Sequence, residues 1–592
     1  MIKAEKLSYS FPQKDLYNKI SFTLEDDVHC AFIGTNGTGK STLVDMILHP
    51  DNYLYDGKLI VDVPGRIGYV SQFYSLDEEK EVTVFDYLSE EFVRLQNEIN
   101  EICDAMATAD ELDELMERYQ NVMDQFQAID GDFYESNIRK QLKIANLKDY
   151  EDHLLTSLSG GEFKLIQVIR EMMISPKFII MDEPDVFLDF EHLNALKNLI
   201  NSHKGTLLVI THNRYLLNHC FNKILHLENA ELQEFDGTYI DYNFALLEMK
   251  IEQQELAAAD MEEIERNRKI VERLRNEATK VDSATKGRSL KARVSLLERL
   301  EARKTKSPFV DIKQPQIELH TSAQLLDREN LAEEKECGIN RNILSVENYS
   351  VTFDRQIMED VTFSLEAGEK VAIVGPNGTG KTTILRDIYK NSNPAIRLDP
   401  DTKIAYLSQM HSEVFDEKET VLKNFEDLGF ETEAQIVAYL KTYGFEEELV
   451  YNKVENLSGG EKNLLQLAKI SRTNADLLLL DEPTSHLDTY SQLALEQAIE
   501  KYEGAVLMVS HDFYTVANCM DYVLLVEDKK LRKMSIRKFR KMIYADHFDK
   551  NYLELEQKKK EVENRIAFTL QAGKFEDAKK YCEDLEQIIN QM

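Results

Sequence analysis

The sequence predicts an α/β protein in which one domain occurs twice in tandem, with a helical hairpin inserted in the first copy and a helical-hairpin linker between the copies. Three observations predict this fold class. The segment AFIGTNGTGKST at 31–42 recurs as AIVGPNGTGKTT at 372–383. The first copy is longer than the second, and the extra length has a helical pattern. A long segment without proline, 240–306, separates the copies.

Four further motifs repeat in the same order along both copies, which excludes a chance match. The pairs are IGYVSQ (67–72) with IAYLSQ (404–409), SLSGGE (157–162) with NLSGGE (456–461), FIIMDEP (178–184) with LLLLDEP (477–483), and VITHN (209–213) with VSHD (509–512). A chain of 592 residues is in any case too long for one hydrophobic core. The sequence therefore predicts two large domains and smaller helical pieces.

The insertion in the first copy lies mainly between Gln72 and Ser159, an interval 38 residues longer than its counterpart in the second copy. Apolar residues recur there at helical spacing in two runs, which predicts a helical hairpin, the arm, over about 82–135. Residues 77–135 hold 19 acidic and 3 basic side chains. A solvated hairpin and a docking surface for a basic partner both remain open for it.

The segment between the copies predicts a helix, a turn and a second helix, because it is rich in Glu, Ala, Lys, Arg and Leu and has its first glycine at Gly287. The predicted boundaries are 1–239 for the first domain, 240–343 for the linker, 344–545 for the second domain and 546–592 for a helical extension.

Composition favours a folded protein of the cytoplasm. Apolar residues make up 43% of the chain, and no run approaches the 18 apolar residues that a membrane helix needs. The six dispersed cysteines have no CxxC spacing, so we expect buried thiols and no zinc site. The formal net charge of −35 opposes nucleic-acid binding, yet residues 266–306 hold 14 basic and 5 acidic side chains.

Each repeated glycine-rich segment has the GxxxxGK[ST] pattern between an apolar strand and an apolar helix, which is typical of a phosphate-binding P-loop. Lys40 and Lys381 would contact the β- and γ-phosphates of a nucleotide, and Ser41 and Thr382 would bind Mg²⁺. A glycine-rich turn without a ligand is the alternative, and two such motifs in register argue against it.

Two carboxylates follow an apolar strand in each copy, at the sheet edge where α/β proteins bind ligands. Asp182 and Asp481 would hold Mg²⁺, and Glu183 and Glu482 would polarise the attacking water. One strand later, His212 and His511 would contact the γ-phosphate.

These motifs resemble the ATP-binding-cassette (ABC) family, whose own signature, LSGGE, occurs at 158–162 and 457–461. The resemblance implies ATP hydrolysis with Mg²⁺ in two sites, each shared between the P-loop of one cassette and the signature of the other. One site would combine Lys40, Gln72, Asp182, Glu183 and His212 with Ser458; the other would combine Lys381, Gln409, Asp481, Glu482 and His511 with Ser159. Gln72 and Gln409 would also bind Mg²⁺.

The nucleotide-binding residues implied by this resemblance belong to the P-loops, the signatures and two aromatic positions. They are Gly34, Thr35, Asn36, Gly37, Thr38, Gly39, Lys40, Ser41 and Thr42 with Ser159, Gly160 and Gly161; Gly375, Pro376, Asn377, Gly378, Thr379, Gly380, Lys381, Thr382 and Thr383 with Ser458, Gly459 and Gly460; and Phe11 and Phe353, which would stack on adenine. Core packing is the alternative for the two phenylalanines.

The two copies are not identical near the predicted catalytic residues. The second reads PTSHLD after Glu482, close to the family pattern, whereas the first reads PDVFLD after Glu183. His212 precedes Asn213, whereas His511 precedes Asp512. Because this segment of the family communicates between the sites, we expect the two sites to hydrolyse ATP at different rates.

The whole layout resembles the F subfamily of ABC proteins, in which an arm is inserted in the first cassette and a charged helical linker joins the two. That resemblance implies a monomer that pairs its own cassettes and binds the ribosomal tRNA exit site, contacting rRNA, ribosomal proteins and peptidyl-tRNA. The basic tip at 280–293 would contact RNA through Lys280, Lys286, Arg288, Lys291 and Arg293. The alternative for the tip is a solvated helical face that binds no RNA.

Housekeeping translation factors and antibiotic-resistance proteins both occur among such proteins, and the sequence does not separate them. The alternative function is the ATP-hydrolysing subunit of a membrane import or export complex. Such a subunit has little use for a basic helical hairpin between its cassettes.

Overall fold

The computed structural model describes residues 1–11, 14–72, 81–107, 112–186, 188–278, 294, 314–322, 341–353, 356–545, 552–589 and 591. The chain divides into two compact units. One unit comprises Met1–Asp236 with Lys313–Lys541, and the other comprises Gly237–Ile312 with Met542–Met592. Both copies of the repeated domain therefore lie in the first unit.

The first copy is built on a six-stranded sheet that is parallel except for its last strand. Its strand order is β5 (Gly68–Val70), β6 (Phe178–Asp182), β7 (Thr206–Ile210), β3 (His29–Ile33), β8 (Lys223–Glu228) and β9 (Glu231–Asp236). Every residue of β6 and β7 is buried, as expected for central strands of a parallel sheet covered on both faces. A smaller antiparallel sheet has the order β2 (Lys14–Leu24), β1 (Ile2–Phe11) and β4 (Asp56–Val61).

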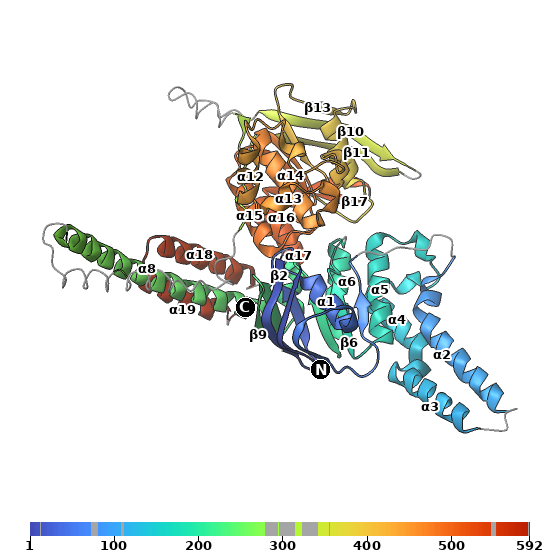
Figure 1. Cartoon of the computed structure of the whole chain (residues 1–592). Coiled ribbons are helices and arrows are strands. Elements are labelled where there is room, and N and C mark those ends of the chain that lie inside the picture. Colours follow the sequence, from blue (N-terminus) through green and yellow to red (C-terminus); the bar gives the residue numbers. More distant parts are fainter. Residues whose placement is uncertain are drawn as a thin grey trace. The chain divides into compact units, whose positions relative to one another are not determined.

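Helices pack beside the sheet of the first copy and against one another (Figure 1). They are α1 (Lys40–Leu48), α4 (Tyr134–Ile144), α5 (Gly160–Ile174), α6 (Phe190–Ser202) and α7 (Arg214–Cys220). The strand order places β3 between β7 and β8, with β6 beside β7. Because these strands are parallel, the segments that follow them emerge at one edge of the sheet.

The second copy repeats this architecture, which confirms the predicted fold class. Its six-stranded sheet has the order β14 (Ile404–Leu407), β15 (Leu477–Asp481), β16 (Ala505–Val509), β12 (Lys370–Val374), β17 (Tyr522–Glu527) and β18 (Lys530–Ser535). Its three-stranded sheet has the order β11 (Gln356–Glu366), β10 (Asn342–Thr352) and β13 (Ile396–Leu398). The helices are α11 (Lys381–Lys390), α12 (Glu433–Thr442), α13 (Glu447–Val450), α14 (Gly459–Thr473), α15 (Thr489–Lys501), α16 (Phe513–Cys519) and α17 (Ile536–Ala545).

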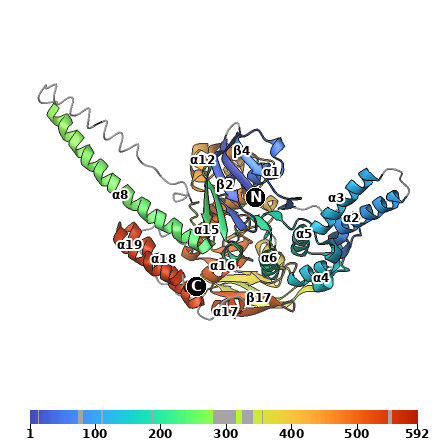
Figure 2. The ribbon, with the colours of Figure 1, turned by 90° about the horizontal axis from the view of Figure 1, so that it is seen from below.

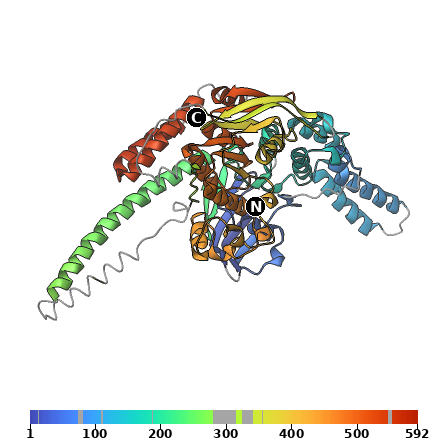
Figure 3. The ribbon, with the colours of Figure 1, turned by 90° about the horizontal axis from the view of Figure 1, so that it is seen from above.

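Two helices occupy the insertion of the first copy, α2 (Val84–Met106) and α3 (Asp113–Ala128). They form a pair that projects from the rest of this copy (Figure 3). The Thr83 side chain caps α2 by accepting from the Asp86 backbone N–H at 3.1 Å, and Arg118 of α3 pairs with Glu98 of α2 at 2.8 Å. The apolar positions of the two runs include Phe92 and Phe126, which are buried.

The second unit joins the helix that leaves the first copy to the C-terminal helices. These are α8 (Tyr239–Ala278), α18 (Tyr552–Gln571) and α19 (Phe575–Ile589), which lie side by side (Figure 2). Ile251 of α8 packs in one apolar cluster with Ile566 of α18 and Cys582 and Leu585 of α19. The C-terminal helices thus pack against the linker helix α8, an association that the sequence alone did not indicate. The second linker helix falls outside the described residues.

Residues 314–322 of the predicted linker pack on the second copy. The Ser322 hydroxyl donates to Asp476 at 2.5 Å, and the Gln316 N–H donates to the Thr442 carbonyl at 2.9 Å. Among the cysteines, Cys103 of α2 is exposed, so the expectation that all the thiols are buried is wrong there. It lies on the projecting hairpin, which buries only one face of each helix.

Candidate active site

Both P-loops lie between a central strand and the start of a helix. In the first copy, β3 ends at Ile33 and α1 begins at Lys40, whose Nζ donates to the Gly34 and Thr35 carbonyls at 2.8 and 2.9 Å. Gly39 at the N-cap has φ of 101°, a conformation that favours glycine. A glycine-rich loop at the start of a helix is the local geometry that binds phosphate through backbone N–H groups.

The P-loop of the second copy has the same geometry. Lys381 Nζ donates to the carbonyls of Gly375 and Pro376 at 2.8 and 2.7 Å. Gly380 at the N-cap of α11 has φ of 86°. Both lysines are buried, which lowers their pKa values against the pull of nearby carboxylates.

The predicted metal-binding groups meet in each copy. Thr382 Oγ1 donates to Asp481 Oδ1 at 3.1 Å. In the first copy burial raises the pKa of Asp182, and the nearby Ser41 hydroxyl opposes this rise. Asp481 Oδ2 is buried with no hydrogen-bond partner among the described residues, and burial raises the pKa of this carboxyl to about 6. An oxygen that lacks a donor beside a hydroxyl fits Mg²⁺, a hard cation that prefers oxygen ligands.

The two predicted catalytic glutamates share a backbone conformation. Glu183 and Glu482 have φ of 45° and 48°, and their N–H groups donate to the carbonyls of Ile210 and Val509 on the neighbouring strands. A non-glycine residue in this region is uncommon and typical of functional sites. Gln72 Nε2 donates to Glu183 Oε2 at 2.6 Å, whereas Gln409 lines the cavity that contains Glu482.

The two histidines follow the strand next to each glutamate. His511 N–H donates to Glu482 Oε2 at 3.2 Å, and its Nε2 lies 3.4 Å from Glu482 Oε1. His212 Nε2 is buried with no hydrogen-bond partner among the described residues. Burial and Lys40 lower the pKa of His212 to about 4, so its imidazole is neutral at pH 7. A neutral imidazole with an N–H to offer suits a γ-phosphate oxygen.

The signature serines cap the helices that follow them. Ser159 and Ser458 accept from the backbone N–H groups of Glu162 and Glu461, and each glutamate carboxylate accepts from the serine N–H in return. These capping boxes fix the start of α5 and α14. In each copy the two glycines of the signature thus form the first turn of the helix.

A cavity of about 700 Å³ is lined by both the signature of the first copy and the P-loop of the second. Its lining includes Ser159, Gly160 and Gly161 together with Phe353, Gly378, Gly380, Lys381, Thr382, Thr383, Gln409, Glu482 and His511. The lining thus includes the combination that the sequence assigned to one of the two shared sites, together with Glu183 and His212, which it assigned to the other. The volume suits a nucleotide.

The reciprocal contact is also present. A methyl group on Gly460 would lie 2.1 Å from Asn36 Nδ2, so the second signature lies directly against the first P-loop. Asn36 Nδ2 donates to the His486 carbonyl at 2.8 Å. The backbone N–H groups of Asn36 and Asn377 donate to Asp488 and Asp189 of the opposite copy at 3.3 and 3.2 Å.

The two aromatic positions do not pack in a core. Phe11 and Phe353 are 48% and 64% exposed, and Phe11 makes an edge contact with Tyr9 at 5.4 Å. Phe353 lines the shared cavity. Their exposure leaves both rings partly available for stacking. The five basic residues of the linker tip, in contrast, lie outside the described residues.

The sequence did not indicate two contacts that distinguish the sites. His486 Nδ1 of the second copy lies 3.6 Å from Glu183 Oε2 of the first, and Asp185 accepts from the Thr211 hydroxyl at 2.6 Å. Burial alone would raise the pKa of Glu183, but the His486 imidazole holds it below its usual value. Burial and Asp481 raise the pKa of Glu482 to about 8. The only sequence signal was the mismatch between PTSHLD and PDVFLD.

The fold and these sites define an ATPase with two nucleotide sites, each shared between paired domains. The family model described as "ABC transporter" matches residues 17–186 and 358–485, together half of the chain. The chain belongs to the ATP-binding-cassette family, in its F subfamily, and is an ATP hydrolase.

Similar proteins extend over most of the chain. The energy-dependent translational throttle protein EttA of Escherichia coli (strain K12) is 28% identical over 88% of this chain and 90% of its own length. The ABC transporter F family member 2 of Arabidopsis thaliana is 27% identical over 89% of this chain and 76% of its own. A solved structure described as RNase-L Inhibitor shares the fold, with a TM-score of 0.53, 18% identity and coverage of 92% and 93% of the two chains.

A membrane-spanning helix is not among the elements described. Across the described ranges, none of the helices combines the length and the apolar character that crossing a bilayer requires.

Proposed function

We propose that this protein is a cytoplasmic ABC-F ATPase that binds the ribosome in its ATP-bound state, at the tRNA exit site, and modulates translation through its linker. The observation that carries the proposal is the position of the basic segment. It continues from α8, a helix of 40 residues that lies outside both cassettes. At 1.5 Å per residue such a helix spans about 60 Å, enough to reach deep into a large RNA assembly.

Charge supports the same proposal. The protein carries a formal net charge of −35, so most of its surface repels RNA, whereas residues 266–306 attract it. The resemblance to a translational throttle protein agrees with a ribosomal target. The acidic hairpin of α2 and α3 would suit a basic ribosomal protein.

In this proposal, binding of ATP with Mg²⁺ changes the protein into the state that binds the ribosome. Ser41, Gln72 and Asp182 in one site, and Thr382, Gln409 and Asp481 in the other, would hold the Mg²⁺ that neutralises phosphate charge. Lys40 and Lys381 would bind the phosphates. The signature serines of the opposite cassettes would complete each site only when the cassettes are closed.

Ribosome co-sedimentation tests the proposal. In the Glu183→Gln, Glu482→Gln double variant, hydrolysis stops while ATP binding persists, so we expect the strongest ribosome binding with ATP and little with ADP. A Lys40→Ala, Lys381→Ala variant, which weakens phosphate binding, is the matched control and should not co-sediment. Absence of an ATP-dependent complex would overturn the ribosomal proposal, and recovery of the protein with a membrane fraction would favour the transporter-subunit alternative.

Protection against ribosome-targeting antibiotics is the finer part of the proposal. Drug susceptibility of cells with and without the protein, measured for lincosamides, pleuromutilins, streptogramins and macrolides, tests it. Increased resistance to one class would assign the protein to ribosome protection. Unchanged susceptibility to all four would leave a housekeeping role in translation.

A further inference from the structure

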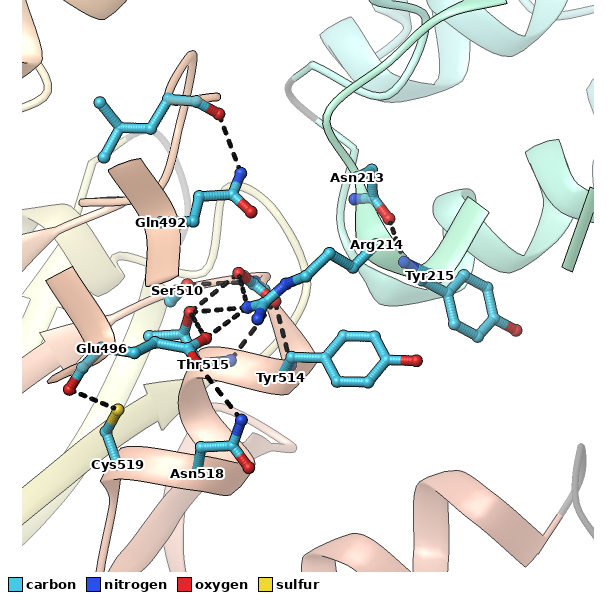
Figure 4. A network of polar contacts seen from close by, with 12 residues as sticks. Asn213, Arg214, Tyr215, Gln492, Glu496, Ser510, Tyr514, Thr515, Asn518 and Cys519 are labelled. Atoms are coloured by element: carbon cyan, nitrogen blue, oxygen red, sulfur yellow. Dashed lines mark hydrogen bonds and ion pairs between the residues drawn. The ribbon is translucent and has the colours of Figure 1, made fainter. Parts of the chain in front are cut away.

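Arg214 of the first cassette inserts its side chain into the second cassette. It is the first residue of α7 and lies two residues after His212. Its guanidinium reaches the side chains of Glu496 on α15 and Thr515 on α16 (Figure 4). The side chain is only 10% exposed, so this contact is part of the interface between the cassettes.

The Arg214 guanidinium pairs with two carboxylates of the second cassette. Arg214 Nη2 pairs with Glu496 Oε1 and lies 3.0 Å from Asp512 Oδ2 and 3.4 Å from Thr515 Oγ1. The guanidinium also lies over the Tyr514 ring, 5.1 Å from its centroid. We call Arg214, Glu496, Asp512, Tyr514 and Thr515 the Arg214 cluster. Both carboxylates are largely buried, so removing the guanidinium would leave two like charges close together.

The cluster connects directly to the second ATP site. Asp512 caps α16, because its Oδ1 accepts from the Tyr514 N–H at 3.0 Å. The residue before it is His511, whose N–H donates to Glu482. The ion pair of Arg214 with Asp512 therefore restrains the backbone next to His511. This restraint holds His511 in position against the predicted catalytic carboxylate of Glu482.

In the part of the chain that the structure describes, the cluster has no two-fold counterpart, because the equivalent residues have different chemistry. Phe513 stands where the first cassette has Arg214, Lys197 stands where the second has Glu496, and Asn213 stands where the second has Asp512. Asn213 caps α7 as Asp512 caps α16, but it carries no charge. Phe513 is buried, with its ring 5.8 Å from that of Phe539 in its own cassette.

We propose that Arg214 is a positioning residue that makes the second ATP site depend on closure against the first cassette, whereas the first site has no equivalent anchor. Closure would bring the guanidinium onto Asp512 and hold His511 beside Glu482. Opening would release Asp512 and His511 together. The proposal depends on ATP hydrolysis and not on the ribosomal role.

ATPase kinetics of single-site variants test this proposal. In the Glu183→Gln background only the second site hydrolyses ATP, and in the Glu482→Gln background only the first does. We expect Arg214→Ala to lower the second-site kcat by roughly tenfold or more, as for loss of one partner from a buried ion pair. The KM for ATP should change by less than about twofold, because the guanidinium is paired with Glu496 and Asp512 and not with the P-loop, although Arg214 lines the shared cavity. First-site kcat should change much less.

Two further variants separate positioning from a general loss of structure. Arg214→Lys keeps the positive charge and should restore part of the second-site kcat. The double variant Arg214→Ala, Glu496→Ala lacks one of the two carboxylates that Arg214→Ala leaves without a cation. Its second-site kcat should therefore fall less than that of Arg214→Ala alone. Lys197→Ala, at the equivalent position of the first cassette, is the matched control and should leave both sites unchanged.

The outcomes are distinct. A second-site loss that exceeds the first-site loss, with partial rescue by Arg214→Lys, supports the proposal. Equal losses at both sites, or unchanged rates in a variant with an unchanged melting temperature, overturn it. If Arg214→Ala does not fold, the Arg214→Lys and double variants give the same comparison.

Discussion

At the residue scale, the two predicted catalytic glutamates differ in their surroundings more than in their backbone. Glu183 faces Gln72 and, across the interface, His486. Glu482 faces His511 of its own cassette and lies beside Asp481. The pKa of Glu183 is lowered and that of Glu482 is raised, so Glu482 is the stronger base once ionised.

The first prediction concerns these glutamates. Glu482→Gln alone should lower total ATP hydrolysis by about 100-fold or more, a typical effect of losing a general base. Glu183→Gln should retain clearly more activity, because the second site continues to turn over. Steady-state phosphate release from the two variants, measured side by side, checks this. Equal residual rates would contradict it.

The second prediction concerns His486. His486→Asn removes the imidazole beside Glu183, and asparagine tolerates the φ of 59° at this position. Without the imidazole the pKa of Glu183 should rise, so first-site hydrolysis in the Glu482→Gln background should increase roughly threefold or more. In the Glu183→Gln background the same change should leave the rate unaltered. A fall in first-site hydrolysis would show that His486 assists Glu183.

At the element scale, the start of the second signature helix, α14, is packed too closely for a side chain at Gly460. Gly460 of α14 faces Asn36 of the first P-loop and the His486 carbonyl, and a methyl group would come within 2.1 and 2.5 Å of them. These are hard contacts, because a backbone carbonyl cannot move away independently. A methyl group on Gly459 would instead meet the His486 side chain at 3.2 Å, which can adjust.

The third prediction follows from this difference. Gly460→Ala should prevent closure at the first site and lower first-site hydrolysis by about tenfold or more. Gly459→Ala, one position earlier in the same helix, is the matched control and should have a smaller effect. Both rates are measured in the Glu482→Gln background. An equal effect of the two substitutions would argue against the packing explanation.

The C-terminal helices provide a second case at this scale. Leu585 of α19 is 2% exposed in the cluster that contains Ile251 of α8, whereas the ion pair of Lys579 with Glu255 is exposed and contributes little. The association of α19 with α8 therefore depends on apolar contacts.

The fourth prediction tests this dependence. Leu585→Asp places a charge in the cluster and should destabilise the second unit by about 3 kcal/mol or more. Trypsin should then cleave α8 faster, while ATP hydrolysis stays unchanged because the cluster contains no residue of either ATP site. Lys579→Ala is the control and should leave the cleavage rate unaltered. An unchanged cleavage rate of α8 in Leu585→Asp would contradict the stabilisation of α8 by its apolar contacts with α19.

At the scale of the whole molecule, charge is divided between distant segments. An acidic arm and acidic cassettes account for the net charge of −35, and the linker carries the concentrated positive charge. Such a division limits RNA contact to one segment. It also separates the part that hydrolyses ATP from the part that would contact RNA.

The fifth prediction uses this separation. Replacing Lys280, Lys286, Arg288, Lys291 and Arg293 together by glutamine should abolish ribosome co-sedimentation in the Glu183→Gln, Glu482→Gln background. Binding by the unaltered linker should weaken steeply as salt rises, since each phosphate contact releases counterions. ATP hydrolysis by an otherwise native chain with the same five changes is the control and should persist. Retained ribosome binding would exclude the linker as the RNA-contacting segment.

The sequence by itself determined the two copies, the P-loops and the strand-end carboxylates and histidines. These features depend on local patterns, such as glycines where φ is positive and apolar strands that end at one sheet edge. It also indicated the helices of the arm and of the C-terminus through their 3.6-residue periodicity. Phe11 and Phe353 are exposed, which sequence alone left open against core packing.

Only the tertiary structure decided which residues meet across the interface. Arg214 and Asp512 are 298 positions apart, and no local pattern relates an arginine at a helix start to a carboxylate in the other cassette. The same holds for His486 beside Glu183 and for α19 against α8. Pairing of distant side chains is set by how the cassettes and helices pack, and packing depends on the complementarity of whole surfaces.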